Sequence, residues 1–170
     1  MKKVGRLLLA TECRGAAAAE MALVLPFLLV IILGSLELGN YFMNEHILVK
    51  AVRDGARFAA RQSFTNYTVC SGSPGGTVQD DTRKIVMNGY LSGGTIITPN
   101  IQTTDINVTT SCKSTAGGQA MSGIYFGRAD GAQVVNVTAS VNYRSVVGAL
   151  GFTGTGFKLN ASSEAAVAGI

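Results

Sequence analysis

Two carboxylates, Glu20 and Glu37, interrupt an otherwise apolar stretch that runs from Ala16 to Phe42. A charged carboxylate in hydrocarbon costs on the order of 2.5 to 3.5 kcal/mol, so an acidic residue held there usually has a partner. For Glu20 that partner is a cation, unless the side chain simply reaches the lipid headgroups at the end of the segment. Glu37 lies near Tyr41, where a polar interface makes its charge less costly.

The residues that usually carry catalysis are scarce in this sequence. His46 is the only histidine and lies close to the apolar stretch, so a Ser/His/Asp triad farther along the chain has no base. The sequence contains no C-x-x-C, H-E-x-x-H or G-K-[ST] pattern, the usual signatures of redox, zinc and nucleotide sites. We therefore expect a protein that is not an enzyme and has no cofactor or metal. An enzyme that uses carboxylates alone is the catalytic alternative.

The apolar stretch is long enough to cross a membrane. Sixteen residues from Met21 to Leu36 carry no charge, and a spanning helix needs about 20 mostly apolar residues. We predict a transmembrane helix over residues 16–42 and, from apolar positions near helical spacing, a helical extension over 43–62. The alternative is a cleaved signal peptide, but the run exceeds a signal core of about 7 to 15 residues, and no A-x-A-like site follows it before Asn40.

The net charge of +4 does not indicate a nucleic-acid partner. Residues 1–15 contribute +3, residues 16–45 contribute −3, and no basic cluster alternates with aromatic residues. Basic residues flank the span on both sides, so the positive-inside rule gives no orientation by itself. Because the N-terminal tail is short, we expect it to stay in the cytoplasm, with the C-terminal domain in the periplasm or outside the cell.

Of the three cysteines, Cys13 precedes the apolar stretch, whereas Cys70 and Cys112 follow it. An oxidising compartment on the far side of the membrane would allow Cys70 and Cys112 to pair. Such a disulfide would stabilise the fold by roughly 4 kcal/mol in the chain-entropy model. The alternative is two buried free thiols.

Residues 63–170 predict a small α+β domain. Thr77, three residues before Asp80, resembles a capping box, and a helix of about 12 residues would end near Gly89. Alternating apolar and polar residues predict an antiparallel sheet of about three strands, near 106–112, 135–143 and 157–161. The glycine-rich connection 113–131 would contact a partner or add a short strand to the core.

The stretch from Arg14 to Arg61 resembles the N-terminal half of the TadE-like minor pilins, the pseudopilins of tight-adherence (Flp-type, type IV) pili. The residues that carry the resemblance are Gly15, Glu20, Pro26, Glu37 and the run Arg53, Asp54, Gly55, Ala56 and Arg57. The residue after the glutamate is commonly aromatic in that family, and here it is Met21. The resemblance implies a pilin-like domain after the helix.

The resemblance also implies that a prepilin peptidase removes residues 1–15 as a leader by cutting after Gly15. Ala16 then becomes the new N-terminus, and Glu20 can meet the ammonium group of a neighbouring subunit, so that each charge lowers the cost of holding the other in lipid. The implied partners are the peptidase, the major pilin, a second minor pilin, the inner-membrane assembly platform and membrane lipid. The implied location is the bacterial inner membrane, which the protein would cross once, or an adhesive pilus on the cell surface. The alternative to a cleaved pilin is a binding domain that stays anchored in the membrane without being cut.

Overall fold

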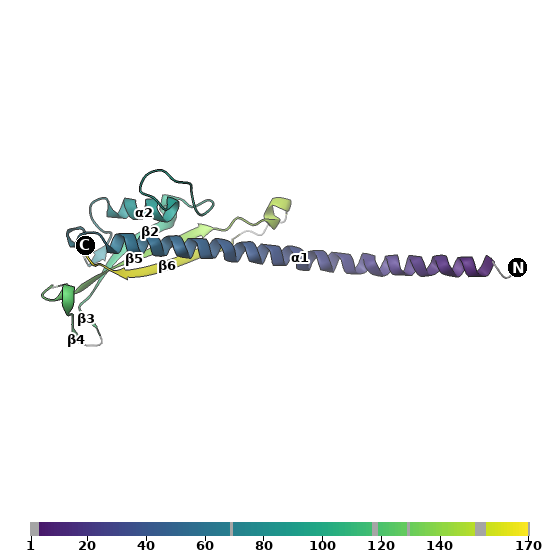
Figure 1. The fold of residues 1–170 in the computed structure, drawn as a ribbon, viewed down its shortest axis with the longest axis horizontal. Helices are drawn as coiled ribbons and strands as arrows, with labels where there is room; N and C mark the ends of the chain where they lie inside the picture. The colour runs from purple at the N-terminus through teal and green to yellow at the C-terminus, as the bar shows by residue number, and fades with distance from the viewer. Residues whose placement is uncertain (1–3, 69, 117–118, 129, 152–155, 170) are drawn as a thin grey trace. The chain divides into compact units, whose positions relative to one another are not determined.

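The computed structural model describes residues 4–68, 70–116, 119–128, 130–151 and 156–169. They divide into two compact units, an N-terminal unit, Met1–Asn40, and a C-terminal unit, Tyr41–Ile170. The long helix predicted from the apolar stretch is present as α1, Val4–Ala60, and α1 contributes to both units (Figure 1). It continues through Pro26, as expected for a proline in an apolar helix.

The C-terminal unit combines helices with an antiparallel sheet, which confirms the predicted α+β class. Its second helix is α2, Val78–Asn88, and short 3-10 helices cover Phe64–Asn66, Thr103–Asp105, Gly123–Tyr125 and Val147–Leu150. The strands are β1 (Ser71–Gly72), β2 (Ile106–Lys113), β3 (Thr115–Ala116), β4 (Gln119–Ala120), β5 (Ala132–Asn142) and β6 (Lys158–Ala166).

Four of these strands form one sheet in the order β1-β2-β5-β6, with every neighbouring pair antiparallel. The three long strands are those that the alternation predicted, and the register places Val108 opposite Val137 and Val137 opposite Ser163. The fourth strand, β1, has only two residues and was missed. β3 and β4 pair with each other in a separate two-stranded sheet, so neither of them adds to the main sheet.

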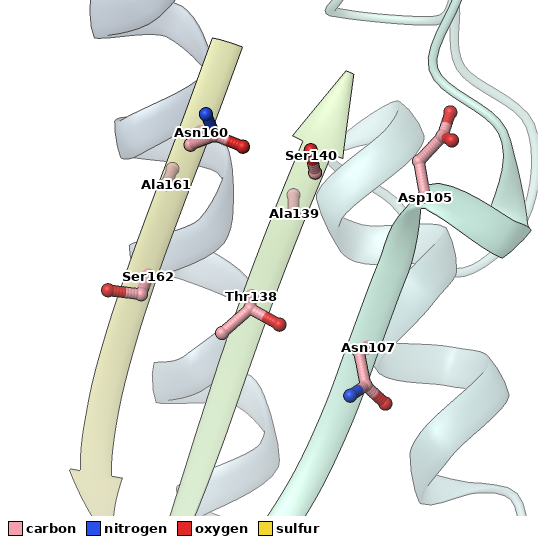
Figure 2. A pocket seen from close by; sticks show the side chains of 8 residues that line it. All are labelled: Asp105, Asn107, Thr138, Ala139, Ser140, Asn160, Ala161 and Ser162. Carbon is pink, nitrogen blue, oxygen red and sulfur yellow. The ribbon is translucent and has the colours of Figure 1, made fainter. Parts of the chain in front are cut away.

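One face of the sheet packs on the helices, and the other faces outward. Alternate residues of β2, of β6 and of β5 from Val135 onward are buried in one core with residues of α1, among them Leu48, Val52 and Ala56. The first four residues of β5 are all buried. On the outer face lie polar side chains of the same strands, with the helices behind them (Figure 2). The period of two in the sequence therefore placed the core face correctly in the three long strands.

Three expectations about the domain were wrong in detail. Phe157 lies before β6 and is 66% exposed, instead of facing the core as a strand residue. Ile124 and Phe126 of the 113–131 connection are also exposed, so this apolar run adds no strand to the core. Thr77 does cap α2 by position, but its side chain makes no capping hydrogen bond, because its backbone is already helical.

At Gly55, α1 lies directly against α2. A Cβ atom added there would overlap Cγ2 of Val86 and lie 3.5 Å from Cγ2 of Thr82. Val86 and Thr82 are fully buried, so neither side chain can turn into solvent to make room. With Val86 opposite, only a glycine lets the two helices come this close.

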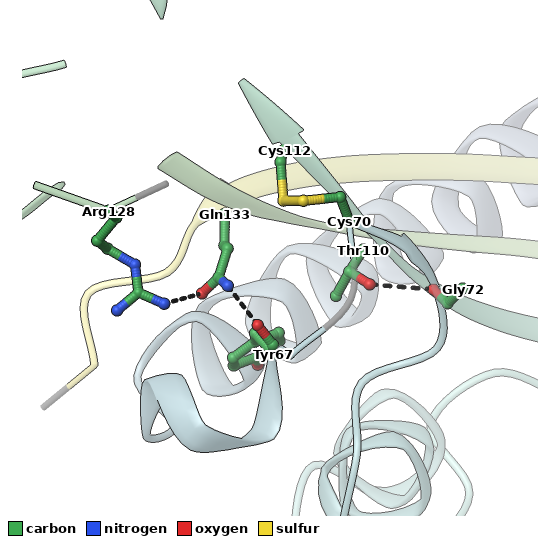
Figure 3. The surroundings of a disulfide bond; sticks show 7 residues. All are labelled: Tyr67, Cys70, Gly72, Thr110, Cys112, Arg128 and Gln133. Carbon is green, nitrogen blue, oxygen red and sulfur yellow. Dashed lines mark hydrogen bonds between the residues drawn. A yellow bond between two sulfur atoms is a disulfide. The ribbon is translucent and has the colours of Figure 1, made fainter. Parts of the chain in front are cut away.

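A disulfide joins Cys70 to Cys112, the pairing expected in an oxidising compartment, and brings β1 beside β2 (Figure 3). Beside it, Thr110 Oγ1 donates to the carbonyl of Gly72 at 3.2 Å, and Gln133 Nε2 donates to the carbonyl of Tyr67. These bonds attach the connection that follows α1 to the sheet.

The phenol of Tyr67 fixes the same connection to the helix. It is buried and donates to the carbonyl of Ala59, one residue before the end of α1. Burial raises the pKa of Tyr67 to about 12. The phenol therefore stays protonated, and able to donate, at any pH that a cell experiences.

We predict that Gly55→Ala lowers the free energy of unfolding of the C-terminal unit by about 1 to 3 kcal/mol, because an added methyl group has no space. The measurement is thermal or denaturant unfolding of the full chain in detergent micelles. Gly39→Ala is the matched control in the same helix, because nothing lies within 4 Å of a Cβ atom there.

Val86→Ala removes the atom that the new methyl group would meet, so the double variant should be less destabilised than the sum of the single variants. Additive effects of Gly55→Ala and Val86→Ala would show that their contact does not set the helix spacing.

We predict that Cys112→Ser, measured in the same unfolding assay, costs roughly 4 kcal/mol, because the disulfide closes a loop of 42 residues in the unfolded chain. Reduction of the wild-type protein should reproduce the loss, and Cys13→Ser should leave stability unchanged. Equal stability of the oxidised and reduced protein would mean that the disulfide is not a structural bond.

Candidate functional site

The residues expected to take part in processing and assembly lie in the N-terminal unit, all on α1. Gly15, Ala16 and Glu20 are exposed, and, apart from the neighbouring turns of α1 itself, no atom of the described residues lies within 4 Å of a Cβ position at Gly15. Ala16 and Glu20 are four residues apart and therefore share one face of the helix, one turn from each other. The backbone next to Gly15 is thus open to a protein that approaches it, and a carboxylate lies close by.

The surface around these residues is apolar and uncovered. All residues from 15 to 32 are exposed, including Leu23 and Phe27 at 71% each. Within the described residues, one helix, Gly15–Ala60, is long and apolar enough to cross a membrane, and none of its most apolar window is buried. This N-terminal apolar helix suggests a single-pass membrane anchor.

Glu37 lies farther along the same unit and is partly buried, unlike Glu20. Between the two, Ser35 Oγ donates to the carbonyl of Ile31 at 2.7 Å, so this hydroxyl is satisfied within the helix. A spanning helix can carry a serine in this way without leaving a polar group unpaired in lipid.

The run from Arg53 to Arg57 belongs to the C-terminal unit and divides into two faces. Gly55 and Ala56 are buried in the domain, whereas Arg53, Asp54 and Arg57 are exposed. Arg57 Nη1 lies 3.9 Å from Asp54 Oδ1, an exposed ion pair that adds little to stability. The two small residues therefore face the core of the domain, and the three charged ones face outward.

Sequence reasoning treated Gly55 only as part of the motif and missed its contact with α2. A signal was present, because Ala51, Gly55 and Ala59 recur every four residues and all three are buried. Small residues at this spacing mark one face of a helix where another backbone comes close.

A separate open hollow lies on the outer face of the sheet (Figure 2). Most of its lining residues are polar, and they come from β2, β5, β6 and the turn before β2: Asp105, Asn107, Thr138, Ala139, Ser140, Asn160, Ala161 and Ser162. The carboxylate of Asp105 accepts a hydrogen bond from the backbone N–H of Gln102 at 2.8 Å. This lining offers hydrogen-bonding groups but no second ionisable side chain that could act as an acid or base with Asp105.

Across the part of the chain that the structure describes, no three His, Cys, Asp or Glu side chains group closely enough to hold an ion.

A comparison with protein families agrees with the residues that suggested the resemblance. The family model described as "TadE-like protein" matches residues 15–57, about a quarter of the chain. No match was found among curated proteins or among solved structures. The match begins at Gly15, ends at Arg57 and covers α1 across both units. Over residues 15–57 the chain is therefore TadE-like, as predicted, and this suggests a pilin-like protein associated with the tight-adherence pilus.

Proposed function

We propose that this protein is a minor pilin, or pseudopilin, that a prepilin peptidase cuts after Gly15 and that takes part in assembly of a tight-adherence pilus. The observation that carries the proposal is the TadE-like match, which starts at Gly15 and includes an exposed glutamate one turn after Ala16. Residues 1–15 are the leader, 16–42 the membrane span, 43–62 the helical extension and 63–170 the extracytoplasmic domain.

Cleavage at Gly15 fits the local physical chemistry. The bond to be cut lies inside α1, so the helix must open before a peptidase can hold an extended backbone. A glycine in a helix costs about 1 kcal/mol relative to alanine, which makes opening easier at this position. Among the described residues, no atom outside the neighbouring turns of α1 lies within 4 Å of a Cβ position at Gly15, which leaves room for the enzyme.

Assembly then depends on two charges that are unfavourable when alone. Cutting creates an ammonium group at Ala16, and Glu20 carries a carboxylate in the same apolar segment. Pairing the carboxylate of one subunit with the ammonium of the next removes both unpaired charges from an apolar environment. The neighbouring subunits are the major pilin and a second minor pilin, collected at the inner-membrane platform.

The disulfide supports the proposed orientation. Disulfides persist in oxidising compartments, and Cys70–Cys112 lies in the unit that follows the apolar helix. The C-terminal domain therefore belongs on the periplasmic or outer side, and the short N-terminal leader belongs in the cytoplasm with the active side of the peptidase.

We predict that the membrane-extracted protein starts at Ala16 in cells that contain the prepilin peptidase and at Met1 in cells that lack it. Intact-mass measurement and N-terminal sequencing check this result. Gly15→Leu should keep the leader in both strains, because a large side chain blocks close approach to the bond. A start at Met1 in all strains would overturn the proposal and favour a permanent, uncleaved anchor.

We predict that Glu20→Gln lowers incorporation into sheared pili by about a hundredfold or more, because breaking a buried charge pair costs about 3 to 5 kcal/mol. Its level in the membrane should not fall, since the neutral side chain inserts at least as well. The measurement is quantitative immunoblotting of pilus and membrane fractions.

Glu45→Gln, in the same helix outside the proposed span, is the matched control and should assemble normally. Normal assembly of Glu20→Gln would disprove the charge pairing, whereas cleavage at Gly15 is tested separately by the N-terminal residue.

A further inference from the structure

The C-terminal unit begins soon after the apolar span in the sequence. Tyr41 is the first residue of this unit and follows Leu36, the last residue of the uncharged run, by five positions in α1. Tyrosines are frequent in the few residues that flank a membrane span, and Tyr41 occupies such a place in the sequence.

Tyr41 holds part of the sheet beside it. Its ring meets the ring of Tyr143 edge to face, with 5.2 Å between centroids, and its hydroxyl donates to the carbonyl of Lys158 at 3.4 Å. The backbone N–H of Tyr143 in turn donates to the carbonyl of Phe157 at 2.9 Å. The ends of β5 and β6 are therefore fixed at the level of Tyr41.

The side chains at this end are the kinds that lipid interfaces favour. Val146 and Phe157 are 51% and 66% exposed, although both are apolar. Arg144 and Lys158, next to them in the sequence, are exposed cations. Exposed apolar groups beside cations match a bilayer interface, where acyl chains begin and phosphates carry negative charge.

We infer that this end of the domain rests on the outer leaflet of the membrane while the subunit is anchored, with Phe157 and Val146 in the interface and the cations on lipid phosphates. We call it the juxtamembrane surface, and it consists of Tyr41, Tyr143, Arg144, Val146, Phe157 and Lys158. The inference requires only that α1 anchors the chain, so it holds whether or not Gly15 is cut.

The opposite end of the same unit provides an internal comparison. Phe126 is 81% exposed, and its neighbour Tyr125 meets the ring of Phe64, four residues beyond the end of α1. Ala60 follows Tyr41 by nineteen residues, which is about 28 Å of helix. Each end thus carries one exposed phenylalanine. Phe157 should contact lipid, and Phe126 should not.

The test uses the full chain in nanodiscs that hold one copy each, with Cys13→Ser as background and the disulfide intact. A fluorescent probe is attached at Phe157→Cys or, as the control, at Phe126→Cys. The discs contain phosphatidylcholine, phosphatidylglycerol and a lipid with a spin label on its headgroup. We expect the spin label to quench the probe at position 157 at least about threefold more than the probe at 126.

Equal quenching at the two positions would overturn the inference, as would a probe at 157 that a water-soluble quencher reaches as easily as the probe at 126. A probe at 157 that neither quencher reaches would also overturn it, because protein would then cover the surface.

The contribution of charge is tested in the same discs. The double variant Arg144→Gln and Lys158→Gln should weaken the contact by about fivefold per cation when phosphatidylglycerol is present, which corresponds to about 1 kcal/mol each. Lys50→Gln with Arg53→Gln, exposed cations elsewhere on α1, is the matched control and should have no effect. An equal loss in both double variants would show that the lipid attracts the net charge of the domain and not this surface.

Discussion

An apolar helical surface that a protein does not cover must be covered by something else. The N-terminal unit carries such a surface, on which Leu23 and Phe27 are mostly exposed. Water cannot cover this surface favourably, because each apolar side chain of this size that is exposed to water costs about 1.5 to 3 kcal/mol. Lipid tails and the apolar helices of other subunits are both acceptable, and they differ little from each other as surroundings for leucine or phenylalanine.

Because lipid and neighbouring helices solvate apolar side chains almost equally well, a single carboxylate can decide which of the two the helix prefers. If apolar contacts gain little when the helix moves from lipid into a bundle of subunits, a polar group has to supply the difference. Glu20 is unfavourable in lipid, and a neighbour's ammonium would relieve that cost. The same residue that makes the helix a poor membrane anchor would thus favour its transfer into a filament, under the function proposed here.

The sequence predicted the elements whose signals are local. The alternation in β2, β5 and β6 and the apolar stretch of α1 were read correctly, since both depend on residues close in sequence. β1 was missed because two residues have no alternation, and this strand exists through its disulfide and its pairing with β2. Thr77 and Phe157 were misread because side-chain bonding at a helix end and the start of a strand depend on tertiary context.

The residues of the candidate site could be predicted from the sequence, but the physical reason for one of them could not. Gly15 and Glu20 stand out because a glycine and a charge are unusual in an apolar helix, and the motif around Gly55 was recognised as a pattern. The physical reason for a glycine at position 55 became clear only from the structure, because the atom that excludes a larger residue belongs to Val86, 31 positions farther along the chain. The juxtamembrane surface likewise joins residues about 100 positions apart through Tyr41 and Tyr143.

Within the C-terminal unit, the domain is attached to α1 at both ends of the segment from Tyr41 to Ala60. At one end Tyr41 contacts Tyr143 and Lys158. At the other end the carbonyls of Ala59 and Ala60 accept hydrogen bonds from the phenol of Tyr67 and the backbone N–H of Ala168. A domain fixed at two points about 28 Å apart cannot pivot on the helix without breaking buried contacts. Any force that draws α1 out of the bilayer would therefore move the whole domain with it, and the lipid contacts of the juxtamembrane surface would have to be given up at that same step.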